Sequence, residues 1–150
     1  MNPVIVLDAG PLSLVTNPRI SQTNRACNQW LQALRTNGIR VIIPEIADYE
    51  LRRELLRANK SRIVTQLDQL EMVLEYLPLN TLAMRQAAEF WANVRQLGQP
   101  TAGDVALDAD VILAAQAVSL GIPGIMIATT NVGHLSRFVT AELWQNIPTS

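Results

Sequence analysis

The chain is 150 residues long, the size of one domain, and we expect residues 1–150 to form a single domain. Hydrophobic residues make up 49% of it and charged residues 17%, which excludes a disordered chain. The formal net charge of −1 excludes the broad basic surface of a protein that coats nucleic acid. The chain has one cysteine, Cys27, and one histidine, His134, which excludes a disulfide framework and a structural zinc site.

We expect a cytoplasmic protein that makes no membrane contact. Pro3 leads directly into an apolar run without the positively charged segment of a signal peptide. The most apolar stretch, residues 111–128, is interrupted by Gln116, Gly121 and Pro123. These interruptions favour a buried helix, a turn and a strand over a membrane span.

Short runs rich in Val and Ile alternate with longer amphipathic stretches along the chain. The runs predict strands at 4–7, 40–43, 76–79 and 124–128, and a short last strand near 144–147. The stretches predict helices between Ser21 and Gly38, from Pro44 onward, and over 63–74, 81–97 and 105–120, with a loop at 98–103. This alternation predicts an α/β fold with a mostly parallel sheet.

Ligands of such sheets bind beyond the carboxyl ends of the strands. Asp8 ends the first strand, and Thr129 and Asn131 end the fourth. The helix before the fourth strand runs antiparallel to the strands, so Asp108 and Asp110 near its start belong to the same edge. Helix capping and turn formation explain any one of these residues alone. Asp108 and Asp110 point about 160° apart around the helix, and Asp110, which leads an apolar run, is expected to point inward.

Glu50, on the helix after the second strand, completes a group of acids from distant parts of the chain. Its alternative role is an intrahelical ion pair with Arg53. Clustered carboxylates repel one another and become protonated unless a cation holds them. Their hard oxygen ligands favour Mg²⁺ or Mn²⁺, which act characteristically on phosphate groups.

Four segments contain these residues: VIVLD at 4–8, IPEIADYEL at 43–51, DADVILAAQA at 108–117 and IATTNVGHL at 127–135. In order and spacing they resemble the PIN-domain nucleases, especially the VapC-like toxins of bacterial toxin–antitoxin pairs. The resemblance covers nearly the whole chain. It implies a three-layer sandwich in which a central parallel sheet of about five strands is flanked by helices.

The resemblance also implies a metal-dependent endoribonuclease that leaves a 5′-phosphate and a 3′-hydroxyl. Asp8, Glu50 and Asp110 are expected to hold Mg²⁺ or Mn²⁺, with Glu50 and Asn131 orienting the attacking water. Asn131 stands where many members have a fourth acid. Thr129 and Asp108 are expected to support the site, and Asp108 is the alternative third acid. The implied partners are RNA, a small antitoxin that masks the acids and a second copy of the chain.

Residues 52–62 contain five basic residues against one acid, Glu54. Such a run is typical of a solvated helix face, but it also suits the guidance of RNA phosphates toward the acids. Arg53 and Arg57 are the candidate RNA-binding residues. The helix faces around Trp30 and around Phe90 and Trp91 are candidate partner surfaces, and a core role for these side chains is the alternative.

Two other functions remain open. A catalytically weak or inactive module that binds RNA or protein is suggested by Asn131 in place of an acid. A receiver-like or phosphatase-like domain that uses Asp8 as a phosphate acceptor is disfavoured, because position 10 is Gly10 and the only lysine is Lys60. A lone histidine is more often structural than catalytic, and no role is assigned to His134.

Overall fold

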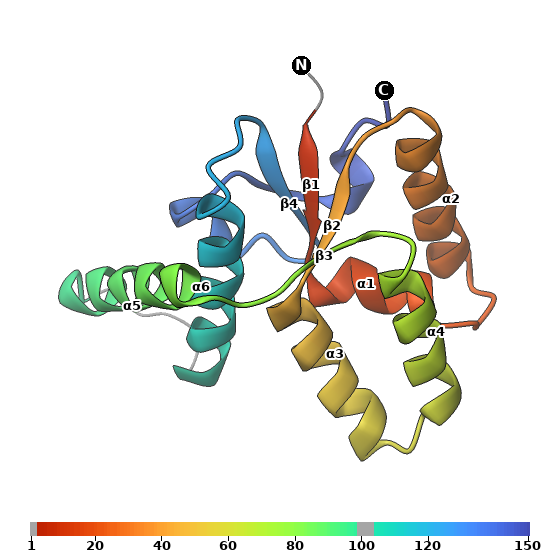
Figure 1. Ribbon diagram of the computed structural model, residues 1–150, viewed down its shortest axis with the longest axis horizontal. Helices are drawn as coiled ribbons and strands as arrows, with labels where there is room; N and C mark the ends of the chain where they lie inside the picture. Colours follow the sequence, from red (N-terminus) through yellow and green to blue (C-terminus); the bar gives the residue numbers. More distant parts are fainter. Residues whose placement is uncertain (1–2, 99–103) are drawn as a thin grey trace.

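A five-stranded parallel sheet forms the centre of the molecule (Figure 1). The computed structural model describes residues 3–98 and 104–150, with side chains for residues 3–98 and 107–150. Its strand order is β3-β2-β1-β4-β5. The strands are β1 Val4–Leu7, β2 Val41–Pro44, β3 Glu75–Leu77, β4 Ile125–Thr129 and β5 Ala141–Leu143. The predicted α/β fold with a parallel sheet is confirmed.

Helices cover both faces of the sheet and make the predicted three-layer sandwich. They are α1 Ala9–Thr16, α2 Gln22–Thr36, α3 Glu45–Arg57, α4 Ser61–Glu71, α5 Thr81–Gln96 and α6 Asp104–Val118, with short 3₁₀ helices η1 Leu135–Arg137 and η2 Trp144–Asn146. In Figure 1, α2 and α4 lie on one side of the sheet and α5 and α6 on the other. Among the helices within the described ranges, none has the length and apolarity needed to cross a membrane.

The central strand β1 contributes to both halves of the core because its side chains alternate. Ile5 and Leu7 are fully buried in the cluster that also contains the buried side chains of α1, α2 and α4. Val4 and Val6 belong to the cluster formed with α6. Both faces of β1 are therefore buried from solvent, as the uninterrupted apolar run at 4–7 predicts.

Most predicted helix boundaries hold to within a few residues. Ser21 caps α2, with its side chain accepting a hydrogen bond from the backbone N–H of Asn24, and Gly38 follows the helix with a φ of 73°. Pro44 ends β2 and is the N-cap of α3 rather than its first residue. The predicted loop at 98–103 falls mainly on residues 99–103, outside the described part of the chain.

Helix α1 was not predicted, because Gly10 and Pro11 indicate a turn. Asp8 is its N-cap and accepts a hydrogen bond from the backbone N–H of Ala9 at 2.7 Å. Pro11 falls in the first turn, where its missing N–H leaves no intrahelical bond unmade. The helix therefore begins directly after β1 and keeps Asp8 at its N-terminus.

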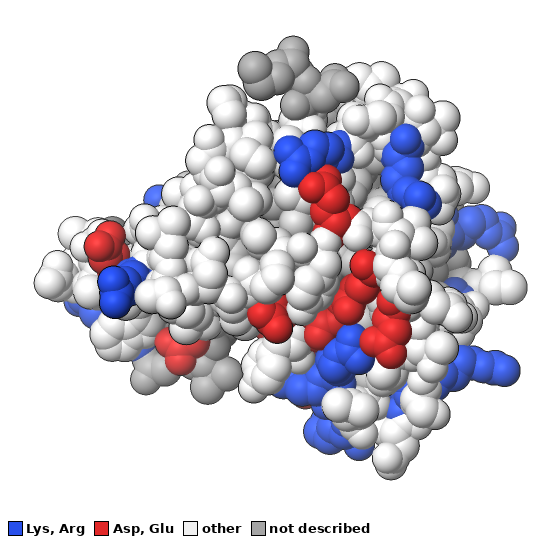
Figure 2. Space-filling view, viewed as in Figure 1, with Lys and Arg blue, Asp and Glu red and all other residues white. Residues whose placement is uncertain are grey.

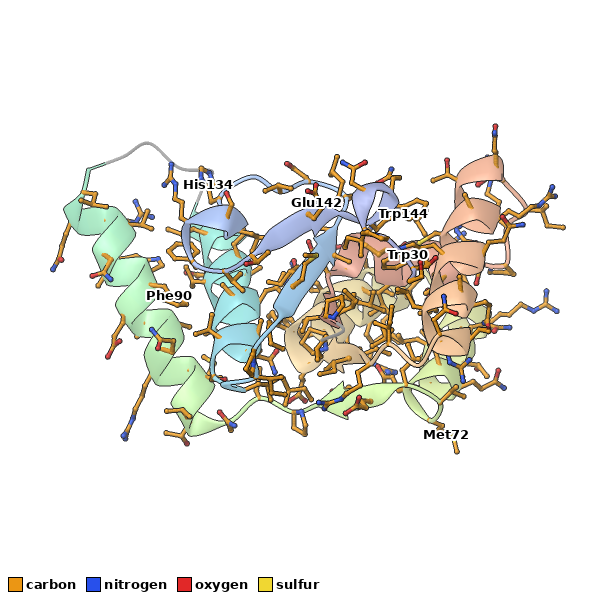
Figure 3. All side chains as sticks on the ribbon, turned by 90° about the horizontal axis from the view of Figure 1, so that it is seen from above. Trp30, Met72, Phe90, His134, Glu142 and Trp144 are labelled. Carbon is orange, nitrogen blue, oxygen red and sulfur yellow. The ribbon has the colours of Figure 1, made fainter. Side chains whose placement is uncertain are left out.

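The last strand lies three residues earlier than predicted. The segment predicted as a strand forms η2 instead, and Trp144 is buried there. Its ring packs against Trp30 at a centroid distance of 5.7 Å (Figure 3), and the indole N–H of Trp30 donates to the carbonyl of Ile147 at 3.1 Å. The face around Trp30 is therefore part of the core, and the hypothesis of a partner surface there is wrong.

Candidate acidic site

The parallel register of β1 and β4 brings the first and fourth strand ends together. Leu7 pairs with Ala128, so the next residues, Asp8 and Thr129, meet at the carboxyl edge of the sheet. The hydroxyl of Thr129 donates to Oδ2 of Asp8 at 2.7 Å and accepts from the backbone N–H of Asn131 at 3.1 Å. Thr129 is only 1% exposed, so this contact orients the carboxylate of Asp8 from the protein interior.

Three carboxylates from three elements line one cavity at this edge. The cavity has a volume of about 380 Å³. Asp8 follows β1, Glu50 comes from the second turn of α3, and Asp110 comes from α6. Sequence reasoning placed all three at the carboxyl edge, and the structure brings them to a common space.

Burial at this edge disfavours the ionised form of all three acids. Burial, followed by the charges of Asp8 and Asp110, raises the pKa of Glu50 to about 7, although the charge of Arg53 opposes the rise. Burial and the charge of Asp8 likewise raise the pKa of Asp110. Burial raises the pKa of Asp8 too, although its hydrogen bonds from Thr129 and Ala9 oppose the rise. The cavity is therefore an electrostatically unfavourable place for three anions alone.

This donor set suits a hard divalent cation, because carboxylate oxygens are the ligands that Mg²⁺ and Mn²⁺ prefer. A cation would also relieve the mutual repulsion of Asp8, Glu50 and Asp110. Within residues 3–98 and 107–150, no three side chains of acidic, histidine or cysteine type already surround a common point as metal ligands do.

The rest of the cavity wall comes from the loop after β4. Asn131 lines the cavity as predicted, and Thr130, Gly133 and His134 line it as well. Sequence reasoning assigned no place in the site to His134, because a single histidine after a strand has no motif of its own. The charge of a protonated His134 imidazole lowers the pKa of Asp110, so the two side chains lie close enough to interact.

Gly10 allows helix α1 to approach this loop closely. A Cβ atom at position 10 would lie 2.5 Å from Oγ1 and 3.1 Å from Cβ of Thr130. Only a residue without a side chain fits there, so α1 begins against the end of β4. Gly10 and Thr130 both line the cavity next to Asp8.

Asp108 does not face the acidic cavity. It is exposed and lines a separate cavity of about 200 Å³ between α3 and α6, together with Tyr49 and Arg53. The guanidinium of Arg53 lies 5.1 Å from the centre of the Tyr49 ring, and its charge lowers the pKa of Glu50. Of the two candidates for the third acid, the structure thus brings Asp110 and not Asp108 to Asp8.

Fewer basic side chains of residues 52–62 are available to contact RNA phosphates than the composition of this segment indicates. Arg52 turns toward α4 and makes ion pairs with Asp48 at 2.9 Å, Asp68 at 2.8 Å and Glu71 at 3.5 Å. Figure 2 shows mixed acidic and basic side chains gathered where Figure 1 places α3 and α4. Arg57 is exposed and pairs with Glu54 at 2.9 Å. Arg53 is the basic residue of this run that lies beside the acids.

Gln116 is a structural residue that sequence reasoning did not single out. Its side chain is 1% exposed. Its Oε1 accepts from the backbone N–H of Ile46 at 3.1 Å, and its Nε2 donates to the carbonyl of Leu77 at 3.0 Å. Pro44 provides no side-chain cap for α3, so Gln116 caps that helix from α6. The two helices that carry Glu50 and Asp110 are thereby joined.

Comparison with known proteins identifies the fold. A scan of the sequence against models of protein families finds no match, and a search of curated proteins finds no significant match. Among solved structures, a chain of VapBC2 from Rickettsia felis, bound to a promoter DNA fragment, has a TM-score of 0.70 at 17% identity. The match covers 94% of this chain and 98% of that one.

Two further solved structures match this chain in fold. FitAcB from Neisseria gonorrhoeae matches with a TM-score of 0.68 at 19% identity, over 96% of this chain and 100% of that chain. DNA-bound VapBC from Salmonella typhimurium matches with a TM-score of 0.65 at 20% identity, over 95% and 98%. At these identities the likeness shows the fold, and the predicted PIN-like, VapC-like fold is confirmed.

Proposed function

We propose that this protein is a Mg²⁺- or Mn²⁺-dependent endoribonuclease and the toxin of a toxin–antitoxin pair. The observation that carries the proposal is the cavity lined by Asp8, Glu50 and Asp110, where burial raises the pKa of all three carboxyl groups. It lies on a fold shared with chains of VapBC complexes. Carboxylates that meet in this way at the carboxyl edge of a parallel sheet suit phosphate chemistry assisted by a divalent ion.

Asp8, Glu50 and Asp110 are the residues that would hold the cation. When bound, it would supply Lewis acidity and charge neutralisation at the scissile phosphate. Thr129 fixes the carboxylate of Asp8 through the 2.7 Å hydrogen bond. Glu50 and Asn131 line the same cavity and orient the water that attacks the phosphorus. The products are a 5′-phosphate and a 3′-hydroxyl.

The proposed partners are a small antitoxin, a second copy of the chain and RNA. A small antitoxin would inhibit the enzyme by placing a cationic side chain among the acids. A further structure that matches this chain, VapBC-5 from Mycobacterium tuberculosis, is a member of the VapBC family of toxin–antitoxin systems, which supports such a partner. A second copy of the chain would dock on the α5–α6 face, where Trp91 is 37% and Met84 45% exposed. Arg53 and Arg57 would meet RNA phosphates, although the pairing of Arg57 with Glu54 weakens that contribution.

A module that binds RNA or protein without cleaving it is the second candidate. Asn131 favours it, because an amide supplies no negative charge to the cavity. An acid at this position would strengthen cation binding. Cation affinity therefore separates the two functions.

Cleavage of a mixed pool of structured and single-stranded RNA tests the proposal. The purified protein, freed of any bound partner, is compared in Mg²⁺, in Mn²⁺ and in EDTA. We expect cleavage with either cation and none in EDTA. Asp8→Asn should abolish it, whereas Asp68→Asn, the same change outside the cavity, should retain it. Products that end in a 2′,3′-cyclic phosphate would contradict hydrolysis by water.

Cation binding is measured separately by thermal unfolding with added Mn²⁺. At a hundredfold excess over the dissociation constant, one bound ion adds about 2.7 kcal/mol to the free energy of unfolding. We expect this stabilisation in the protein with native Asp8 and in Asp68→Asn, but not in Asp8→Asn. Absence of both stabilisation and cleavage would favour the binding module.

A further inference from the structure

A second cavity adjoins the acidic one through a shared wall. Glu50 lines both cavities, the acidic one of about 380 Å³ and the α3–α6 one of about 200 Å³. Side chains at spacings of three and four residues on α3 form one wall, and residues near the start of α6 form the other. The lining residues are Ile46, Tyr49, Glu50, Arg53, Asp108 and Ile112, with Ala109 between them.

The chemistry of this cavity suits a flat neutral ring. Its volume is below the range of about 300–1,000 Å³ that is typical of sites for drug-sized ligands. Tyr49 is 55% exposed and the guanidinium of Arg53 lies over its ring, so the two together present an exposed aromatic and guanidinium surface. Aromatic rings and guanidinium groups are the surfaces on which unpaired bases of single-stranded RNA stack. Ile46 and Ile112 provide apolar walls for such a ring.

The charges of the residues that line this cavity disfavour an anionic ligand and favour one with N–H donors. Asp108 and Glu50 contribute two carboxylates to this cavity against the single guanidinium of Arg53. A phosphate group is disfavoured inside this cavity, so Arg53 would meet an RNA phosphate only from outside it. A carboxylate accepts hydrogen bonds through both oxygens, and guanine presents adjacent N1–H and N2–H donors on its Watson–Crick edge. Uracil presents one donor between two carbonyls and matches less well.

We propose that the α3–α6 cavity binds the nucleobase next to the scissile phosphate. The base stacks on Tyr49, and Asp108 selects guanine. This inference rests on the proposed ribonuclease function, and it adds a specificity site to it. The phosphate lies on the acidic side of Glu50 and the base on the other side. Cleavage next to guanine in unpaired RNA follows.

Titration with GMP, AMP, CMP and UMP in EDTA tests the site independently of cleavage. The four ligands carry the same phosphate, so a difference in affinity reports on the base. Binding is followed by NMR at the signals of Tyr49 and Ile112. We expect GMP to bind most tightly and to shift both signals. Equal affinities for the four nucleotides, or shifts only elsewhere, would overturn the proposal.

Variants of the exposed cavity residues sharpen the test. Stacking of one base contributes about 1–3 kcal/mol, so Tyr49→Ala should weaken GMP binding on the order of tenfold. Tyr49→Phe keeps the ring and should restore the affinity. Asp108→Asn should remove the preference for GMP over AMP. Leu56→Ala is the control, a truncation on the same helix at a 59% exposed side chain outside the cavity. It should change neither the affinity for GMP nor the preference for GMP over AMP. Equal losses in Tyr49→Ala and Leu56→Ala would refute the assignment.

Mapping of cleavage positions separates this proposal from the proposed function. Cleavage without any enrichment of guanine, unchanged by Tyr49→Ala, would leave the nuclease standing and overturn the base site. Selective GMP binding without cleavage in Mg²⁺ or Mn²⁺ would support the base site and overturn the proposed nuclease function. Burial of Tyr49 between two copies of the chain, detected as protection of its ring in a dimer that excludes GMP, would also overturn the base site.

Discussion

Replacement of Gln116 by methionine tests the connection between the two helices that carry Glu50 and Asp110. Methionine keeps nearly the same length and volume but has neither the amide donor nor the carbonyl acceptor. The substitution therefore leaves the backbone N–H of Ile46 and the carbonyl of Leu77 without their partner. Ile46 is 5% exposed, so water cannot readily replace the lost bond.

The magnitude follows from these two groups. An unsatisfied buried backbone group costs about 1–3 kcal/mol. The N–H of Ile46 should incur most of this cost, and the carbonyl of the half-buried Leu77 less. We expect Gln116→Met to lower the free energy of unfolding by about 2–4 kcal/mol, which corresponds to a fall in Tm of roughly 4–16 °C for a domain of this size.

Urea unfolding in EDTA, followed by circular dichroism, measures the change. The matched control is Gln32→Met, the same substitution at an exposed position of α2, which should change the free energy of unfolding by less than about 0.5 kcal/mol. A second readout is Mn²⁺ affinity at a temperature where both variants are folded. It should fall in Gln116→Met, because the start of α3 loses its cap. Equal stabilities of the two variants would refute the role of Gln116.

Three further changes probe the acidic cavity itself. Gly10→Ala places a Cβ against Thr130 and should lower the free energy of unfolding in urea by about 1–3 kcal/mol. Adding Thr130→Ala should restore most of that loss. An unchanged free energy of unfolding in Gly10→Ala would contradict the close contact. Thr129→Val removes the hydroxyl that donates to Asp8, so NMR titration in EDTA should show a higher pKa for Asp8 than in the protein with Thr129. Burial and neighbouring acids raise the pKa of Glu50 from 4.5 to about 7, so the folded state binds more protons between these values and its stability falls as pH rises through them. Glu50→Gln should therefore gain stability over the native chain in EDTA at pH 8 but not at pH 4, and an equal difference at both pH values would refute this cause.

The sequence alone predicted where the acids would lie better than what they would contact. Asp8 illustrates this. Capping and function were alternatives for it in the sequence, yet the structure shows a cap and a cavity residue at once. Oδ1 accepts from the backbone N–H of Ala9 and Oδ2 from the hydroxyl of Thr129, and the same residue lines the cavity. A carboxylate has two oxygens, so the two roles do not exclude each other.

Residues whose position depends on tertiary contacts could not be predicted from local patterns. His134 reaches the cavity because the loop after β4 turns at Gly133, which has a φ of 47°. Gln116 lies within an apolar run that predicts only burial, and its two partners are distant in sequence. Arg52 was predicted as part of a basic strip because its acidic partners on α4, Asp68 and Glu71, lie a helix away.

The same geometry links stability to cation binding. The strand order β2-β1-β4 brings the elements that carry these residues to one edge, so Asp8, Glu50 and Asp110 line a common cavity. Without a cation their repulsion and burial destabilise the fold, and contacts such as those of Gln116 offset this cost. With a cation the same carboxylates become its ligands. Neutralising Glu50 should therefore stabilise the metal-free protein and lower its affinity for Mn²⁺. Such a conflict between stability and ligand binding is expected of a functional site.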